Sequence, residues 1–412
     1  MPPPGMTAQR PAPGWLALLC ATRTLQATVA TAWAGVLPQV MADWQLSAAR
    51  AGMVQGAWHA GYLVSLFAVG FIADRVGPRR VFLAGSLLTA LAAFAFALGL
   101  RGPLSAALLF GLTGLCAGAC YSPGLQLLAA NAPPQARGRA MGAFIGAASL
   151  GYGLSLALVA ATSHALPWRT VLLAIAGVCA LGAVLTVPAL RRMRPDPVAC
   201  GARRPSVRSA LGATLRDRKA MAGNWAYAAH CWELMALWAW LPAYLAVSAA
   251  QGGLSPAQGI ALAALAHLVS VAGSLAGGSL SDRLGRTTVM MAASCASLAC
   301  ALGFGWIGGA PLWALALAGA LYNLLAIADS SVYSTALADV VPPERLGAAY
   351  SVRSVMGFGA GAVSPMAFGL ALDWGQGHAP AMAWGLAWST VAAGALLGPG
   401  MILRLRRLTR GA

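Results

Sequence analysis

The sequence predicts an all-α polytopic membrane protein of twelve transmembrane helices, arranged as two pseudo-symmetric six-helix bundles. Three observations predict this class. Apolar residues make up 59% of the 412 residues and charged residues only 9%, whereas ordinary globular chains carry roughly 25% charged residues. Positive residues gather in alternate loops between apolar runs, and one glycine-containing loop occurs twice, about half a chain apart. Most side chains must therefore face lipid or other helices.

Apolar runs long enough to cross a bilayer divide the chain. A helix needs about 20 residues to cross roughly 30 Å of hydrocarbon. Twelve such runs are predicted, at residues 15–40, 52–72, 80–100, 104–130, 140–162, 169–190, 221–246, 257–279, 288–308, 312–337, 348–371 and 381–403. The first run is too long for a signal-peptide core, so we expect it to remain as the first span.

The twelve runs fall into two halves. The predicted domains are a cytoplasmic N-terminal tail (1–14), an N-terminal six-helix bundle (15–190), a basic cytoplasmic linker (191–220), a C-terminal six-helix bundle (221–403) and a cytoplasmic C-terminal tail (404–412). Landmarks such as Pro38 with Pro242 and Pro134 with Pro343 align the halves at a nearly constant offset of 204 to 209 residues. This constancy indicates an internal duplication, which many secondary transporters contain.

The positive charges predict how the chain crosses the membrane. With the N-terminus inside, the cytoplasmic segments hold 22 of the 27 Lys and Arg residues. The outside loops hold Arg50, Arg101 and Arg169, and the spans hold Arg23 and Arg353. Short cytoplasmic loops carry an excess of Lys and Arg. We therefore expect both termini in the cytoplasm and a multi-pass location in a bacterial inner membrane.

Composition also argues against several other classes. A nucleic-acid-binding protein concentrates its basic residues on a soluble face, whereas here they occupy short loops between apolar runs. The eight cysteines nearly all fall within apolar runs without a Cys-x-x-Cys pair, so we expect neither disulfides nor a metal site. The chain lacks a phosphate-binding Gly-x-x-x-x-Gly-Lys loop and a catalytic cluster. We expect no cofactor, no enzymatic activity and no nucleic-acid partner.

A short loop is repeated at equivalent positions of the two halves. It reads Gly70-x-x-x-Asp74-Arg75-x-Gly77 after the second span and Gly278-x-x-x-Asp282-Arg283-x-Gly285 after the eighth. The first glycine of each copy allows two helices to approach closely, and the last allows a tight turn. The aspartate can accept hydrogen bonds from a neighbouring helix N-terminus or from an arginine. Each loop is therefore predicted to latch helices on the cytoplasmic side, and plain turn chemistry is the alternative.

The two loops resemble the signature loop of the major facilitator superfamily (MFS), and the resemblance covers twelve spans and a central basic linker. It implies two six-helix bundles that rock about a midplane site, with latches that stabilise one of two access states. Drug/proton antiporters of this superfamily usually carry a Gly-Pro pair in span 5, which this chain lacks. Drug export is therefore the less favoured function.

Ionisable residues inside spans are costly, so they mark candidate functional sites. Arg23 lies eight residues after Trp15, about 12 Å along a helix. We expect its guanidinium to bind a carboxylate or similar oxyanion in the central cavity, and a snorkelling arginine is the alternative.

Span 7 carries Tyr227, His230 and Glu233 at three-residue spacing, near one helical stripe. In the superfamily that the chain resembles, spans 1 and 7 line the cavity. Arg23, His230 and Glu233 are therefore predicted to form one substrate site with Tyr227. A structural lock between Arg23 and Glu233 is the alternative. Glu233, helped by His230, is also predicted to carry a coupled proton.

Other polar residues within spans are weaker candidates. His59, Asn323 and Gln126 are predicted to contact substrate, although an interhelical hydrogen bond is the commoner role of a lone histidine in a span. Asp329 and Arg353 lie at a similar depth on either side of one turn. They are expected to form a gating pair.

The predicted function is secondary active transport of a small organic or inorganic anion, by alternating access and coupled to protons. A drug or metabolite efflux antiporter is the alternative within the same class. A transporter-like sensor or assembly factor without transport is the alternative from another class, but the linker of about 30 residues is too short for a soluble output domain. We expect the chain to function as a monomer in the lipid bilayer.

Overall fold

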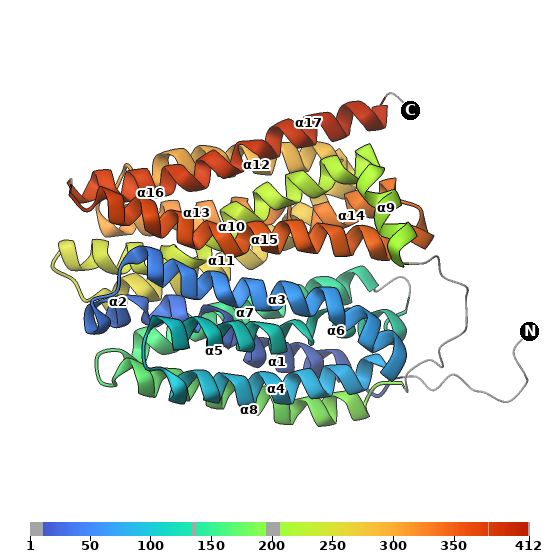
Figure 1. Cartoon of the computed structure of the whole chain (residues 1–412), viewed down its shortest axis with the longest axis horizontal. Helices are drawn as coiled ribbons and strands as arrows, with labels where there is room; N and C mark the ends of the chain where they lie inside the picture. The colour runs from blue at the N-terminus through green and yellow to red at the C-terminus, as the bar shows by residue number, and fades with distance from the viewer. Residues whose placement is uncertain (1–10, 134–136, 195–206, 378, 411–412) are drawn as a thin grey trace, which may run out of the picture.

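The computed structural model describes residues 11–133, 137–194, 207–377 and 379–410, and it contains two helical bundles joined by a linker. Figure 1 shows the N-terminal bundle below and the C-terminal bundle above, with their helices roughly parallel to one long axis. Helices α3 and α7 of the first bundle pack against α15 and α11 of the second. These two helix pairs form most of the interface between the halves.

The N-terminal bundle contains α1 (Trp15–Ala27), the 3-10 turn η1 (Thr28–Thr31), α2 (Ala32–Trp44), α3 (Ala48–Val76), α4 (Pro78–Gly99), α5 (Pro103–Gly118), α6 (Tyr121–Asn131), α7 (Arg137–Thr162) and α8 (Trp168–Arg191). The C-terminal bundle contains α10 (Arg218–Gln251), α11 (Pro256–Leu284), α12 (Arg286–Phe304), α13 (Leu312–Ala328), α14 (Ser330–Val340), α15 (Pro343–Gly375), α16 (Pro380–Ala395) and α17 (Leu397–Arg410). Within the described chain, ten helical segments are long and apolar enough to cross a membrane. Two further helical segments, residues 15–44 and α3, correspond to the first two predicted spans and complete the twelve.

The linker and the C-terminus contain more helix than the sequence suggested. A ten-residue helix, α9 (Val207–Arg216), lies within the segment predicted as a polar linker, and it packs on α15. Helix α17 runs to Arg410, beyond the predicted end of the last span at residue 403. The predicted tail 1–14 and linker 191–220 also include residues 1–10 and 195–206, and the C-terminal tail includes 411–412, all of which lie outside the described residues.

Four of the spans are interrupted within the bundles, and the last of these breaks is at Leu396, between α16 and α17. The first is broken by η1, where the Thr28 hydroxyl donates to the Leu25 carbonyl at 2.7 Å, a side-chain bond that competes with helical pairing. The fourth is broken between α5 and α6, and the tenth at Asp329 between α13 and α14. Spans 4 and 10 are equivalent in the duplication, so the two halves are broken at matching places. Discontinuous helices of this kind line the sites of many transporters.

The repeated loop has the same backbone in both copies. Gly77 has φ 93° and ψ 140°, and Gly285 has φ 88° and ψ 145°. A positive φ of this size disfavours residues with a Cβ, which is why glycine occupies both turns. Gly70 and Asp74 of the first copy lie outside the residues whose surroundings the structure describes.

The second copy ties α11 and α12 to α14 of the same half. Arg286 forms an ion pair with Asp282 and donates to Asp339 at 3.3 Å. Arg283 and, in the first copy, Arg75 are exposed.

The close helix approach predicted for the first glycine of this copy occurs one residue earlier. A Cβ on Gly277 would lie 1.7 Å from the Ala328 carbonyl oxygen, whereas a Cβ on Gly278 would meet only a Ser331 hydroxyl at 3.4 Å. The prediction for Gly278 was wrong by one position, because a shift of one residue turns the facing side of a helix by about 100°.

The two halves meet backbone to backbone along α3 and α15. A Cβ at Gly52 would lie 2.0 Å from the Pro365 carbonyl oxygen, and one at Gly56 would lie 2.1 Å from that of Ala362. Any larger residue would force the helices apart, so small residues define this contact. It lies toward the end of the molecule where α3 begins and α15 ends, on the left in Figure 1.

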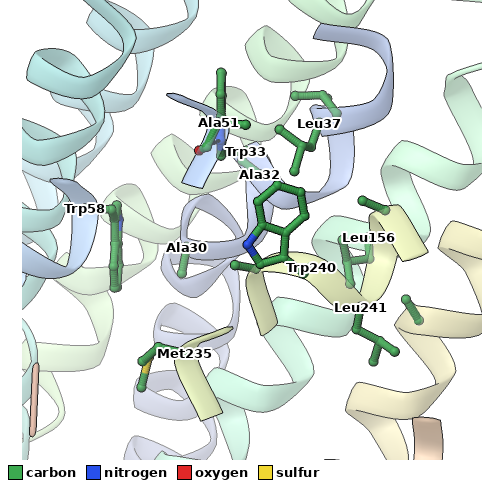
Figure 2. Close-up of a cluster of buried hydrophobic side chains, with 14 of the residues drawn as sticks. Ala30, Ala32, Trp33, Leu37, Ala51, Trp58, Leu156, Met235, Trp240 and Leu241 are labelled. Carbon is green, nitrogen blue, oxygen red and sulfur yellow. Dashed lines mark hydrogen bonds between the residues drawn. The ribbon is translucent and has the colours of Figure 1, made fainter. Parts of the chain in front are cut away.

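A buried aromatic and aliphatic cluster extends across the interface between the halves. Figure 2 shows Trp33 of α2 and Trp240 of α10 within this cluster, with Leu156 of α7 beside them. The indole N–H of Trp33 donates to the Ala51 carbonyl, and that of Trp240 donates to the Pro365 carbonyl, each at 3.0 Å. Both indoles are thus buried with their polar group satisfied, as buried tryptophans require.

A carboxylate from one half caps a helix of the other. Asp373 of α15 accepts hydrogen bonds from the backbone N–H groups of Ala48 and Ala49, each at 2.8 Å. These are the first residues of α3, whose N-cap is Ser47. A negative charge at a helix N-terminus satisfies free N–H groups and interacts favourably with the helix dipole. The cap therefore holds the halves together at this end.

The Asp373→Ala variant is expected to weaken this closure by about 1 kcal/mol, the usual value of a helix N-cap. Nitroxide labels at positions 45 and 377, in a background without native cysteines, would report a broader and longer distance distribution by pulsed electron spin resonance. Asp43→Ala is the matched control, because Asp43 accepts from Trp168 within a single half at 3.2 Å. An unchanged distribution in Asp373→Ala would contradict the role of the cap.

Candidate functional site

A cavity of about 130 Å³ lies between the two bundles, and both of them supply its walls. The N-terminal side comes from α1, η1, α3, α6 and α7, and the C-terminal side from α10, α13, α14 and α15. The volume corresponds to about four water molecules at roughly 30 Å³ each. A ligand that fits it without rearrangement is small.

Arg23 lines this cavity from α1, as predicted from its depth in the first span. Its side chain is 7% exposed, and its guanidinium carbon lies 5.8 Å from the ring centre of Tyr121 and 5.5 Å from that of Phe144. Among the described residues, no carboxylate lies within ion-pair distance of it, and its Nε has no hydrogen-bond partner. Arg23 therefore forms no lock with Glu233, and aromatic faces provide its surroundings.

Arg353 lines the same cavity from α15. Its guanidinium donates to the Ser334 hydroxyl at 2.6 Å and lies 4.6 Å and 4.8 Å from the ring centres of Tyr227 and Tyr350. The predicted gating pair with Asp329 is wrong, because Asp329 is engaged elsewhere. The pairing was predicted from the similar depth of the two residues in the membrane, and depth alone does not give the direction in which each side chain points.

His230 is the partner of Asp329. Its Nδ1 lies 2.9 Å from the Asp329 carboxylate, and its Nε2 lies 3.1 Å from the Ser330 hydroxyl. Tyr227 stacks on the imidazole with ring centres 5.7 Å apart and planes at 26°. Tyr227, His230 and Ser330 line the cavity. This brings the break between α13 and α14 into the wall of the site.

Glu233 does not share the site with Arg23 and His230, contrary to the prediction. It is 4% exposed, and its Oε2 accepts from the Ser297 hydroxyl of α12 at 3.0 Å, inside the C-terminal bundle. Each three-residue step turns a helix by about 300°, so successive positions shift by about 60° around the axis. Over two steps from Tyr227 the side chain turns about 120°, enough to leave the cavity face.

His59 lines the cavity from α3, as predicted. Its Nε2 lies 3.4 Å from the Gln55 amide, its ring packs edge-on against Trp58, and its Nδ1 has no partner among the described residues. Its counterpart in the duplication, His267, is fully buried against Trp238 and Tyr152. The symmetric histidines thus have different surroundings.

Asn323 and Gln126 are not among the residues that line the cavity. Asn323 is fully buried, accepts the indole N–H of Trp238 at 2.9 Å and donates to the Ala266 carbonyl at 3.1 Å. It therefore positions Trp238, which does line the cavity. Gln126 of α6 is half-buried.

Several lining residues were not among the predicted site. They include Gln55, Trp58, Tyr62, Trp238, Ser354 and Phe358. Most are aromatic or small polar residues, which are common in any span and carry no signal of their own. Helical spacing to a known site residue was the available clue, because Gln55 and Tyr62 lie about one turn on either side of His59. Among the described residues, no group of three or more His, Cys, Asp and Glu side chains is arranged to hold a metal ion.

Two helical bundles with broken spans around a shared polar cavity define the class of the protein, which is a membrane transporter. A family model described as Major Facilitator Superfamily matches residues 19–356. The chain therefore belongs to the major facilitator superfamily, whose members are transporters and not enzymes. The family assignment and the twelve-helix fold class predicted from the repeated loop are confirmed.

Solved structures of the family agree with this fold. A bacterial homolog of the human lysosomal transporter Spinster, in an inward-facing and unoccupied conformation, matches with a TM-score of 0.71 and 15% identity, over 95% of this chain and 96% of that one. The nucleoside transporter NupG matches with a TM-score of 0.76 and 15% identity, over 95% of this chain and 99% of that one. Similarity at this identity concerns the fold alone.

Curated relatives match shorter segments. An uncharacterized MFS-type transporter of Mycobacterium tuberculosis is 41% identical over 93 residues, which cover 23% of this chain and 21% of that protein. A gallate transporter of Pseudomonas putida is 34% identical over 143 residues, which cover 34% of this chain and 31% of that protein. The matches thus span about a fifth to a third of the lengths of these relatives.

The Asn323→Ala variant tests how the cavity wall is held. Removing the amide leaves the Trp238 indole N–H without its acceptor, so we expect a loss of about 1 to 3 kcal/mol in unfolding free energy. Thermal unfolding in detergent would show it as a lower midpoint. Ser279→Ala is the matched control, because Ser279 is exposed and bonds only a carbonyl of its own helix among the described residues. Equal midpoints in the two variants would exclude this positioning role.

Proposed function

We propose that this MFS transporter carries a small organic anion and couples its movement to protons. The observation that carries the proposal is Arg23, a buried guanidinium that lines the cavity without a carboxylate partner among the described residues. An unpaired charge is costly to bury, and a ligand carboxylate is the natural group to offset that cost, since guanidinium binds it in a two-pronged geometry.

The similarity to a gallate transporter supports an organic acid as the cargo, because that relative is named for a carboxylic acid. The aromatic residues of the cavity, such as Trp58, Tyr62 and Phe358, provide apolar surface for the carbon skeleton of such a ligand. An inorganic anion would leave this surface without a partner. We therefore favour an organic anion over an inorganic one.

Proton coupling is assigned to the buried acidic residues of the C-terminal bundle. Glu233 is buried against Ser297 without a cation at ion-pair distance among the described residues, and Asp329 is paired with His230 at the cavity wall. A buried carboxylate that lacks a cation is an established type of proton carrier in membrane proteins. Its separation from the cavity lets the proton and the substrate bind at different places.

The proposed function predicts that Arg23→Gln abolishes anion uptake into proteoliposomes. Arg23→Lys keeps the positive charge but loses the two-pronged hydrogen bonding of the guanidinium group, so it should reduce uptake roughly tenfold. Labelled organic acids, taken up under an imposed pH gradient, are the readout. Arg101→Gln is the control, because Arg101 is exposed in a loop. If Arg23→Gln and Arg23→Lys both transport every acid at the wild-type rate, anion binding at Arg23 is refuted.

Proton coupling predicts a different phenotype for Glu233→Gln. This variant keeps the shape of the side chain but cannot exchange a proton, so it should lose accumulation driven by a pH gradient while still exchanging substrate across the vesicle membrane. Asp43→Asn, which changes an exposed carboxylate outside the cavity and the repeated loops, serves as the control. Accumulation at the wild-type level in Glu233→Gln would remove Glu233 from the coupling mechanism.

A further inference from the structure

The cavity contains a second arginine whose charge the protein does not neutralise. Arg353 is 9% exposed, its Nε has no hydrogen-bond partner among the described residues, and its guanidinium donates to the neutral Ser334 hydroxyl. Among the described residues, no carboxylate lies within ion-pair distance of it. Asp329, the acidic residue expected to pair with it, is held by His230. Arg353 is therefore in the same electrostatic situation as Arg23.

The two guanidinium groups come from different halves and pack on different aromatic rings. Arg23 belongs to the N-terminal bundle and packs against Tyr121 and Phe144, whereas Arg353 belongs to the C-terminal bundle and packs against Tyr227 and Tyr350. Their aromatic sets share no member. The cavity therefore contains two positive charges, one supplied by each half.

Aromatic side chains of both halves meet in the cavity that the two arginines line. Tyr62, beside Arg23, packs on Phe358 of α15 with ring centres 5.0 Å apart. Phe358 lies five residues after Arg353 on the same helix. A ligand that contacts both arginines has aromatic surface from both halves available for its carbon skeleton.

From these observations we propose that the substrate is a small organic dianion, a dicarboxylate whose two carboxylates are bound by Arg23 and Arg353, one arginine from each half. The inference rests on the proposed anion transport and goes beyond it, because it names the charge of the substrate and a second binding residue. A ligand of this kind offsets both buried charges and connects the two bundles that must move relative to one another. A monocarboxylate offsets only one of the charges.

The volume of the cavity limits the length of the ligand. A cavity of about 130 Å³ favours a short dicarboxylate over a long-chain acid. The probes are therefore straight-chain dicarboxylates from malonate to glutarate, each compared with the monocarboxylate of the same carbon number. Succinate and butyrate are the central pair, because they differ only in the second carboxylate.

The experiment measures the ratio of succinate to butyrate affinity by isothermal titration calorimetry with the purified, detergent-solubilised full chain. The wild type is expected to bind succinate at least tenfold more tightly than butyrate. Arg353→Gln should lower succinate affinity roughly 10- to 100-fold more than butyrate affinity, the range that a hydrogen bond to a charged group implies. Arg353→Lys, which keeps the charge, should recover part of the preference.

Arg50→Gln is the matched control, since it removes one positive charge from an exposed position and should leave the ratio unchanged. The unfolding temperature of each variant without ligand identifies a folding defect. If Arg353→Gln has such a defect, Arg353→Lys serves as the decisive variant. Equal affinity of the wild type for the two acids, or a ratio that Arg353→Gln leaves unchanged, overturns the dianion inference while anion transport through Arg23 stands. If neither series of acids binds the wild type, the proposed function itself fails.

Discussion

A guanidinium buried inside a helical bundle needs a replacement for the water that it loses, and in this protein aromatic faces supply it. Arg23 and Arg353 both lie over tyrosine or phenylalanine rings, and neither has a carboxylate within reach among the described residues. Cation–π contacts lower the cost of burial without cancelling the charge. Two positive charges therefore remain without an acidic partner, among the described residues, in the cavity that both bundles enclose.

The acidic residues of the spans are placed away from these arginines. Asp329 is paired with His230, and Glu233 is directed toward α12. A direct salt bridge between either acid and either arginine would have neutralised the site, and buried pairs of that kind are hard to open. Under the proposed function, this separation keeps the arginines available for an anion and the acids available for protons.

Much of the fold was predictable from the sequence because membrane burial constrains composition strongly. The twelve spans and the tight turns at Gly77 and Gly285 followed from hydropathy and from a repeated motif whose glycines have a physical reason. The break at η1 was not predictable, because it depends on local hydroxyl bonds in an otherwise apolar run.

The candidate site was predicted only in part. Depth along a span follows from counting residues, so Arg23, His59, Tyr227 and His230 were placed at the cavity. The direction of a side chain depends on helix rotation, which counting does not give, and this is why Glu233 was misplaced. The duplication gave the depth but not the direction, since aligning Pro38 with Pro242 sets Arg23 level with Tyr227 and both line the cavity.

The contact between α3 and α15 has a consequence for the rate of any movement between the halves. Gly52 and Gly56 meet carbonyl groups directly, so no side chain is inserted from one helix into a pocket of the other at these points. Interlocked side chains must change rotamer before two helices can part, and each such change adds to the activation barrier. Smooth backbone surfaces separate and meet again without that step. Glycine at these positions therefore allows the helices to lie close together and also lowers the activation barrier for separating them.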